Sequence, residues 1–207
     1  MKNIDLVALR NPDDPLQLYS IHYVDKPVSE WQYWTELFQD AERIEKILEE
    51  RESELLLNSL DKSVVKSVIL SEGKQYDTIL KAMPLHGTFK SLMSYKNFYS
   101  GKLKLQNLMD YVITIYGGRK RKRNIPDAHG VFHLYEGSHT RLYGLMFGSD
   151  TLVIIGGCIK TSENLQGSVF TKHIPGEIDR IQSLFNKFGA TRDWFDGDNF
   201  PLYTDNI

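Results

Sequence analysis

The chain has 207 residues, of which 41% are hydrophobic and 12% aromatic, so it is long enough to bury the core of one ordinary domain. Its 25 Lys and Arg nearly balance its 27 Asp and Glu, and the formal net charge of −2 excludes a uniformly basic nucleic-acid-binding protein. A basic surface would therefore have to come from an uneven distribution of charge along the chain.

Cysteine usage and hydropathy predict a cytoplasmic protein that does not enter a membrane. The one cysteine, Cys158, excludes an internal disulfide and a metal site built from several cysteines. It lies in an apolar run, which favours a buried hydrophobic role over that of a catalytic nucleophile. Residues 1–14 do not have the pattern of a signal peptide, and no apolar run approaches the roughly 20 residues of a membrane span.

The N-terminal part of the chain predicts two strands and one long helix. Residues 4–9 form a short apolar segment, and residues 16–24 alternate, with tyrosine and isoleucine on the better-packed face. Ser29 is suited to cap a helix, and residues 30–57 follow it with apolar positions at three-and-four spacing. We therefore expect residues 16–60 to contain the first strand of the main sheet and the long helix that follows it.

Residues 61–106 predict a helical insertion that is interrupted near Glu72 and Gly73. In its second half, aromatic residues alternate with lysines, as on single-strand-binding surfaces and equally on helices whose lysines extend along apolar surface. Three aromatic rings of the preceding helix could likewise form a platform for stacked bases, but their helical spacing favours packing in the core. These rings are Trp31, Trp34 and Phe38.

The C-terminal half predicts a set of strands and a final helix. Short turns with Gly and Asp separate the later strands, which indicates antiparallel hairpins. The last strand is apolar at nearly every position, so we expect it to be central and covered on both faces. A helix begins near Pro175 and ends by Gly189. The expected strands are residues 108–116, 131–136, 141–147 and 151–159.

This order of elements predicts an α+β fold that forms a single domain over residues 1–207. We expect a small antiparallel or mixed sheet of about four to five strands, packed against the N-terminal helices and followed by a C-terminal helix, with the helices on one face of the sheet. Residues 107–189 would hold most of the sheet and this helix, and residues 190–207 would form a C-terminal arm.

Four short segments carry a resemblance to a known family. They are Leu-Tyr-Glu at 134–136, Arg-Leu-Tyr at 141–143, Cys-Ile-Lys-Thr at 158–161 and Pro-Gly-Glu-Ile at 175–178. Together with the order of the elements, they resemble the RelE/ParE toxin superfamily, in particular its HigB-like, phage-derived branch. The resemblance covers residues 105–188 and implies the α+β fold of that superfamily.

The resemblance implies a toxin of a toxin–antitoxin pair that cuts messenger RNA, usually in the ribosome, without a metal or another cofactor. Its partners would be RNA or the ribosome and an antitoxin protein. Such cleavage uses the 2′-hydroxyl as the nucleophile, and it requires a base, a cation beside the phosphorane and an acid. The candidate catalytic residues are Arg141, Tyr143, Lys160, His133 and His139.

The predicted strands bring part of this set together. Strict alternation places Arg141 and Tyr143 on the same strand face, and His139 lies in the turn just before them. A simpler interpretation pairs Arg141 with Glu136 across the hairpin, where an exposed ion pair contributes little. The chain would then be a non-catalytic interaction protein with a degenerate RelE-like fold.

Five consecutive basic residues follow the strand at 108–116 and are candidate RNA-binding residues. Each phosphate contact would add affinity that depends on salt, although the run also suits an acidic protein partner or a solvated turn. The histidines do not form an HExxH pair, and the chain lacks a glycine-rich nucleotide fingerprint, so we expect neither a metal nor another cofactor. The run consists of Arg119, Lys120, Arg121, Lys122 and Arg123.

Overall fold

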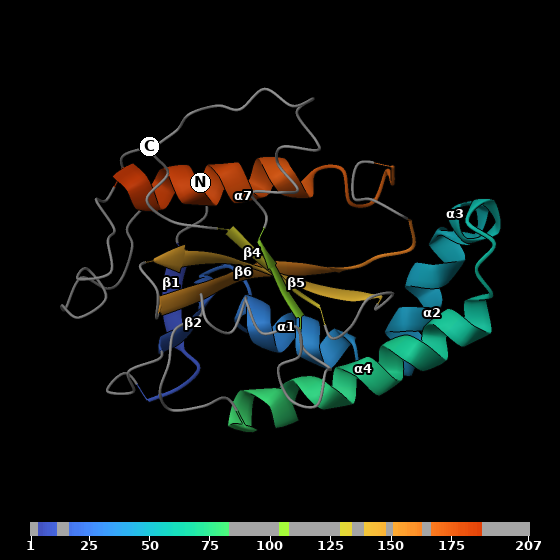
Figure 1. Ribbon diagram of the computed structural model, residues 1–207, viewed down its shortest axis with the longest axis horizontal. Helices are drawn as coiled ribbons and strands as arrows, with labels where there is room; N and C mark the ends of the chain where they lie inside the picture. Colours follow the sequence, from blue (N-terminus) through green and yellow to red (C-terminus); the bar gives the residue numbers. More distant parts are fainter. Residues whose placement is uncertain are drawn as a thin grey trace.

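A mixed β-sheet with helices on both faces forms the centre of the molecule (Figure 1). The computed structural model describes residues 4–11, 17–82, 104–107, 129–133, 139–147, 151–162 and 167–187. The α+β class expected from the sequence is confirmed. In chain order the elements are β1 (Ile4–Ala8), β2 (Gln17–Tyr23), α1 (Glu30–Leu37), α2 (Ala41–Glu50), α3 (Glu52–Leu57), α4 (Lys62–Ala82), β3 (Lys104–Asn107), β4 (His129–His133), β5 (Thr140–Phe147), β6 (Thr151–Ile159) and α7 (Ile174–Lys187).

The described sheet has six strands in the order β1-β2-β6-β5-β4-β3, rather than the four to five expected. All neighbours are antiparallel except β2 and β6, which run parallel. Parallel strands need a long crossover connection, and the one between β2 and β6 includes helices α1 to α4 and strands β3 to β5. The strand expected at residues 108–116 lies outside the described residues, and β3 occupies the end of the expected helical insertion instead.

Strand β6 is central and covered on both faces, as predicted. Leu152 and Ile154 pack toward the N-terminal helices, and Val153 and Ile155 pack toward α7. The expectation that the helices share one face of the sheet is therefore wrong. The apolar stripe of α7 packs on the sheet face opposite the N-terminal helices. That stripe consists of Ile174, Ile178, Ile181, Leu184 and Phe185.

The single helix expected over residues 30–57 is wrong, because two breaks divide it into α1, α2 and α3. Ser29 caps α1 as predicted, and α1 ends at Leu37, with Phe38 as its C-cap residue. The Asp40 carboxylate then accepts hydrogen bonds of 3.0 Å from the backbone N–H groups of Glu42 and Arg43, which begins a new helix. The apolar spacing continues across the breaks because all three helices contribute to one core.

Helix α4 has no break at Glu72 and Gly73, contrary to the prediction. Gly73 lies where α4 crosses the end of α1, and a Cβ atom there would be 2.3 Å from the carbonyl oxygen of Phe38. The glycine therefore permits a close approach of two helices instead of ending one. Trp31 and Phe38 belong to this core, as their helical spacing predicts, with Phe38 packed against Tyr76 of α4.

Candidate functional site

A cavity of about 510 Å³ lies at the point where the parallel strands diverge. Pairing of β2 with β6 ends at Ser20 and Ile154, beyond which β6 continues past the cavity. The walls come from α1 on one side and α7 on the other. In open sheets, ligands bind beyond the carboxyl ends of parallel strands, and the volume suits one small ligand.

The floor of the cavity contains the glycine pair of β6. At Gly157, a Cβ atom would lie 2.7 Å from the Trp34 ring, so this glycine admits the indole against the strand. At Gly156, a Cβ atom would meet only a Glu30 carboxylate oxygen, at 3.9 Å. A glycine inside a strand often marks such an approach, and Gly156 leaves open space above the backbone.

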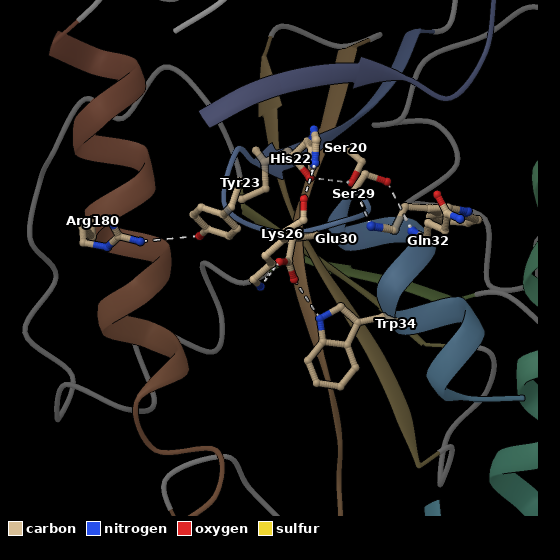
Figure 2. A network of polar contacts seen from close by, with 11 residues as sticks. Ser20, His22, Tyr23, Lys26, Ser29, Glu30, Gln32, Trp34 and Arg180 are labelled. Carbon is tan, nitrogen blue, oxygen red and sulfur yellow. Dashed lines mark hydrogen bonds and ion pairs between the residues drawn. The ribbon is translucent and has the colours of Figure 1, made fainter. Parts of the chain in front are cut away.

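The α1 wall carries a buried carboxylate, Glu30, that is 5% exposed. Its Oε1 forms an ion pair with the Nζ of Lys26, and its Oε2 accepts a hydrogen bond of 3.0 Å from the Nε1 of Trp34 (Figure 2). Buried carboxylates are stable only with such partners. The two contacts also fix the direction in which the carboxylate faces the cavity.

The α7 wall is joined to β2 through Arg180 and Tyr23. The Nη2 of Arg180 donates to the Tyr23 hydroxyl at 3.5 Å, and Figure 2 shows this arginine reaching across from α7. Burial raises the pKa of Tyr23, and the positive charge of Arg180 partly opposes that shift. The Lys26 ammonium lies 4.7 Å from the centroid of the Tyr23 ring, so two cations approach one tyrosine.

A third cation, Arg51, lines the cavity from the junction of α2 and α3. The Arg51 guanidinium lies 4.7 Å from the centroid of the Phe170 ring and donates to the backbone carbonyl of Ile159. Burial lowers its pKa, although a guanidinium stays charged in proteins. Three cations, Lys26, Arg51 and Arg180, thus line the cavity together with two carboxylates, those of Glu30 and Glu177.

Tyr143 reaches the cavity from β5, where it meets the single cysteine. The tyrosine hydroxyl lies 3.0 Å from the sulfur of Cys158, and both side chains are buried. Burial raises the pKa of the Cys158 thiol, which disfavours the nucleophilic thiolate. Cys158 is 3% exposed, so it behaves as the buried hydrophobe that the sequence favours.

Arg141 and Tyr143 occupy alternate positions of β5, in agreement with the predicted strand face. Cys158, the β6 partner of Arg141, belongs with Tyr143 to the core under α7. The two candidates are only 8% and 2% exposed, and the Nη1 of Arg141 donates to the Thr140 carbonyl at 2.7 Å. Glu136, its expected ion-pair partner, lies outside the described residues.

His139 and Lys160 lie side by side where β5 begins and β6 ends. The backbone N–H of Lys160 donates to the His139 carbonyl at 2.6 Å, and the His139 Nδ1 lies 2.8 Å from the Lys160 carbonyl oxygen. Because a carbonyl only accepts, Nδ1 carries the proton in this contact. Glu72 of α4 accepts from the backbone N–H groups of His139 and Thr140, which fixes the turn.

The remaining candidates are not placed relative to this site. His133 ends β4, and its side chain lies outside the described part of the structure. The basic run at residues 119–123 lies outside it as well. Of the five catalytic candidates, Tyr143 lines the cavity, and His139 and Lys160 form a separate pair at the sheet end.

The charged residues of the cavity were missed by sequence reasoning. Glu30, Arg51 and Arg180 look like ordinary solvent-facing helix charges in the sequence. The available signal was the glycine pair at 156–157 inside an otherwise apolar strand, because such a pair indicates that something approaches the backbone.

Within the described ranges, no three side chains of His, Cys, Asp or Glu gather closely enough to hold a metal ion. None of the described helices is both long and apolar enough to cross a membrane. Compared with known proteins, the chain matches no protein-family model, no curated protein and no solved structure.

Proposed function

We propose that this chain is a RelE/HigB-like cytoplasmic protein that binds single-stranded RNA and holds one nucleotide in the cavity between α1 and α7. The observation that carries the proposal is the combination of aromatic rings and cations in one cavity of about 510 Å³. Aromatic rings stack on bases of any sequence, and arginine and lysine bind phosphate. The rings are those of Tyr23, Tyr33, Trp34, Tyr143 and Phe170.

The size of the cavity favours a single strand over a duplex. A duplex covers the faces of its bases, whereas a loop or an end can present one unstacked base to a protein pocket. The cation Lys26, from the loop before α1, and the cation Arg180, from α7, both approach Tyr23, which suits a phosphate beside a stacked base. The basic run at residues 119–123 would add phosphate contacts along the strand.

A variant that fills the cavity without changing its charge tests the proposal. Gly156→Val adds a side chain where a Cβ atom has only ordinary contacts, so the strand should tolerate it while the base is excluded. We expect the affinity for a fluorescent single-stranded RNA, measured by anisotropy, to fall about tenfold or more, given that each stacked base contributes about 1–3 kcal/mol.

The matched control is Gly176→Val, because a Cβ atom at this exposed position in the first turn of α7 has no neighbour within 4 Å. The control should bind RNA like the wild type, and thermal unfolding should show that both variants fold. RNA binding that survives Gly156→Val unchanged would place the RNA elsewhere and refute the proposal.

A second candidate is the metal-independent endoribonuclease that the resemblance implies. The contact between His139 Nδ1 and the Lys160 carbonyl favours it, because the tautomer with a proton on Nδ1 leaves a basic Nε2. His139 would take the 2′-hydroxyl proton, with Lys160 beside the phosphate and with Arg141, Tyr143 and His133 as the further candidates. The partner would then be an antitoxin protein that suppresses the activity.

Gel analysis of a labelled transcript distinguishes cleavage from binding alone. A nuclease of this kind should leave 2′,3′-cyclic phosphate ends in the presence of a chelator, and His139→Ala should slow cleavage at least about 100-fold, a typical contribution of a general base. Transcripts that stay intact with the wild type, both in vitro and after induction in a bacterial host, would exclude the nuclease and leave RNA binding as the activity.

A further inference from the structure

The Glu30 carboxylate is an acceptor held in one orientation on the cavity wall. Lys26 contacts Oε1 and Trp34 contacts Oε2, and each of these residues is four positions from Glu30 in the sequence. An ionised carboxylate has about four acceptor positions, so acceptor capacity remains on each oxygen. Because Gly156 has no Cβ atom, the space beside Oε2 stays open to a ligand.

Such an acceptor distinguishes the four RNA bases on their Watson–Crick edges. Guanine presents two adjacent donors, N1–H and the N2 amino group, which match the two oxygens of a carboxylate. Adenine and cytosine present one amino group beside a ring nitrogen lone pair, and uracil presents one N–H between two carbonyls. Only guanine offers a bidentate, charge-assisted pair to a group that accepts but does not donate.

We propose that the cavity prefers guanine, with Glu30 accepting from N1–H and the N2 amino group of the base. This inference rests on the proposed function and adds the identity of the bound nucleotide. Figure 2 shows Arg180 on the opposite side of Tyr23 from Glu30, so a base at Glu30 leaves the phosphate near the arginine. The fixed carboxylate then selects the base, and the cations bind a part that all nucleotides share.

Competition binding with the wild-type protein tests the preference directly. GMP, IMP, AMP, CMP and UMP would each displace a fluorescent single-stranded RNA of mixed sequence, followed by anisotropy. We expect GMP to bind at least about fivefold more tightly than AMP, CMP or UMP, which is the lower end of the discrimination of a bidentate pair. IMP, which keeps N1–H and lacks the N2 amino group, should fall between GMP and AMP.

The Glu30→Gln variant assigns the preference to this side chain. An amide pairs one acceptor with one donor, so it cannot match both guanine donors, and the advantage of GMP over AMP should shrink to about twofold or less. The control is Glu36→Gln, on the exposed part of α1, where Glu36 pairs with Gln32 away from the cavity lining. It should retain the full preference.

The outcomes separate this inference from the proposed function. Equal displacement by the four RNA mononucleotides, or an unchanged GMP preference in Glu30→Gln, would overturn the guanine assignment while RNA binding in the cavity stands. Absence of RNA binding by the wild type would overturn both. Glu30→Gln also removes the charge partner of Lys26, so thermal unfolding of the variant is measured as well. If the variant does not fold, the comparison of GMP with IMP on the wild-type protein tests the guanine assignment instead.

Discussion

Gly73 determines, as a single residue, how closely α4 approaches α1. Alanine in its place would gain about 1 kcal/mol of helix propensity, but its Cβ atom would lie 2.3 Å from the backbone oxygen of Phe38. Because that neighbour is backbone, the two helices must separate, and we expect Gly73→Ala to lower the free energy of unfolding by about 1–3 kcal/mol in urea titrations. Gly176→Ala, with open space around its Cβ atom, should be neutral or slightly stabilising.

The ion pair between Lys26 and Glu30 is half buried, and removal of one partner should cost more than removal of both. The lysine side chain is 33% exposed and the glutamate side chain 6% exposed. Lys26→Met leaves the buried carboxylate with Trp34, and we expect a loss of about 2 kcal/mol, below the usual cost of breaking a fully buried pair. In a double-mutant cycle, Glu30→Gln added to Lys26→Met should recover part of this loss; strictly additive effects would show that the pair contributes no coupling.

Glu45 of α2 forms ion pairs with Lys62 and Lys66 of α4, and these pairs predict a pH effect. Hydrogen bonds from Lys62 and Lys66 lower the pKa of Glu45 from 4.5 to about 2. A carboxyl group whose folded pKa is depressed stabilises the fold above its unfolded pKa, and the stabilisation is lost as the pH falls through the folded value. The difference in melting temperature between the wild type and Glu45→Gln should therefore be constant above pH 5 and shrink between pH 4.5 and 2. A difference independent of pH would contradict the assignment.

Helix α4 is tied to the beginning of β5 by two side chains. Glu72 accepts from the backbone N–H groups of His139 and Thr140, and the Tyr76 hydroxyl lies 2.7 Å from the Oγ1 of Thr140. Glu72→Ala leaves buried donors without their acceptor and should cost about 2–4 kcal/mol, whereas Tyr76→Phe should cost about 1 kcal/mol. Lys74→Ala, at an exposed position of the same helix, is the control for both variants in chemical denaturation.

Elements with a strong local pattern were predictable from the sequence, and their ends depended on details that the pattern does not contain. Strand β6 and helix α7 matched their predictions because an apolar run and an amphipathic stripe with Pro175 define them locally. The breaks between α1, α2 and α3 were missed because the apolar spacing continues through them, although Asp40 is a strong helix cap. At Gly73, the propensity of glycine suggested an end where tertiary packing maintains a helix.

The cavity was not predictable at the scale of the whole molecule, because it results from a long-range pairing. Strands β2 and β6 are separated by more than half of the chain, and their parallel alignment brings Glu30 and Trp34 of α1 close to β6. Local periodicity contains no information about that alignment. Sequence reasoning did place Arg141 and Tyr143 on one strand face, but it did not show that α7 would cover that face.

The charge distribution of the whole molecule predicts how RNA binding responds to salt. The chain as a whole carries a net charge of −2, whereas the cavity is lined by three cations and two carboxylates. The cavity, and not the whole molecule, therefore has the positive charge that attracts a polyanion. Each phosphate contact contributes about 0.7 to the slope of log affinity against log salt for a single strand. Arg180→Ala should reduce the slope by about this amount, and Lys74→Ala, on α4 across the sheet from α7, should leave it unchanged (Figure 1). The slopes are measured from 50 to 200 mM salt, a range over which about six phosphate contacts would change the affinity markedly. Equal slopes for the wild type and Arg180→Ala would mean that Arg180 does not bind a phosphate.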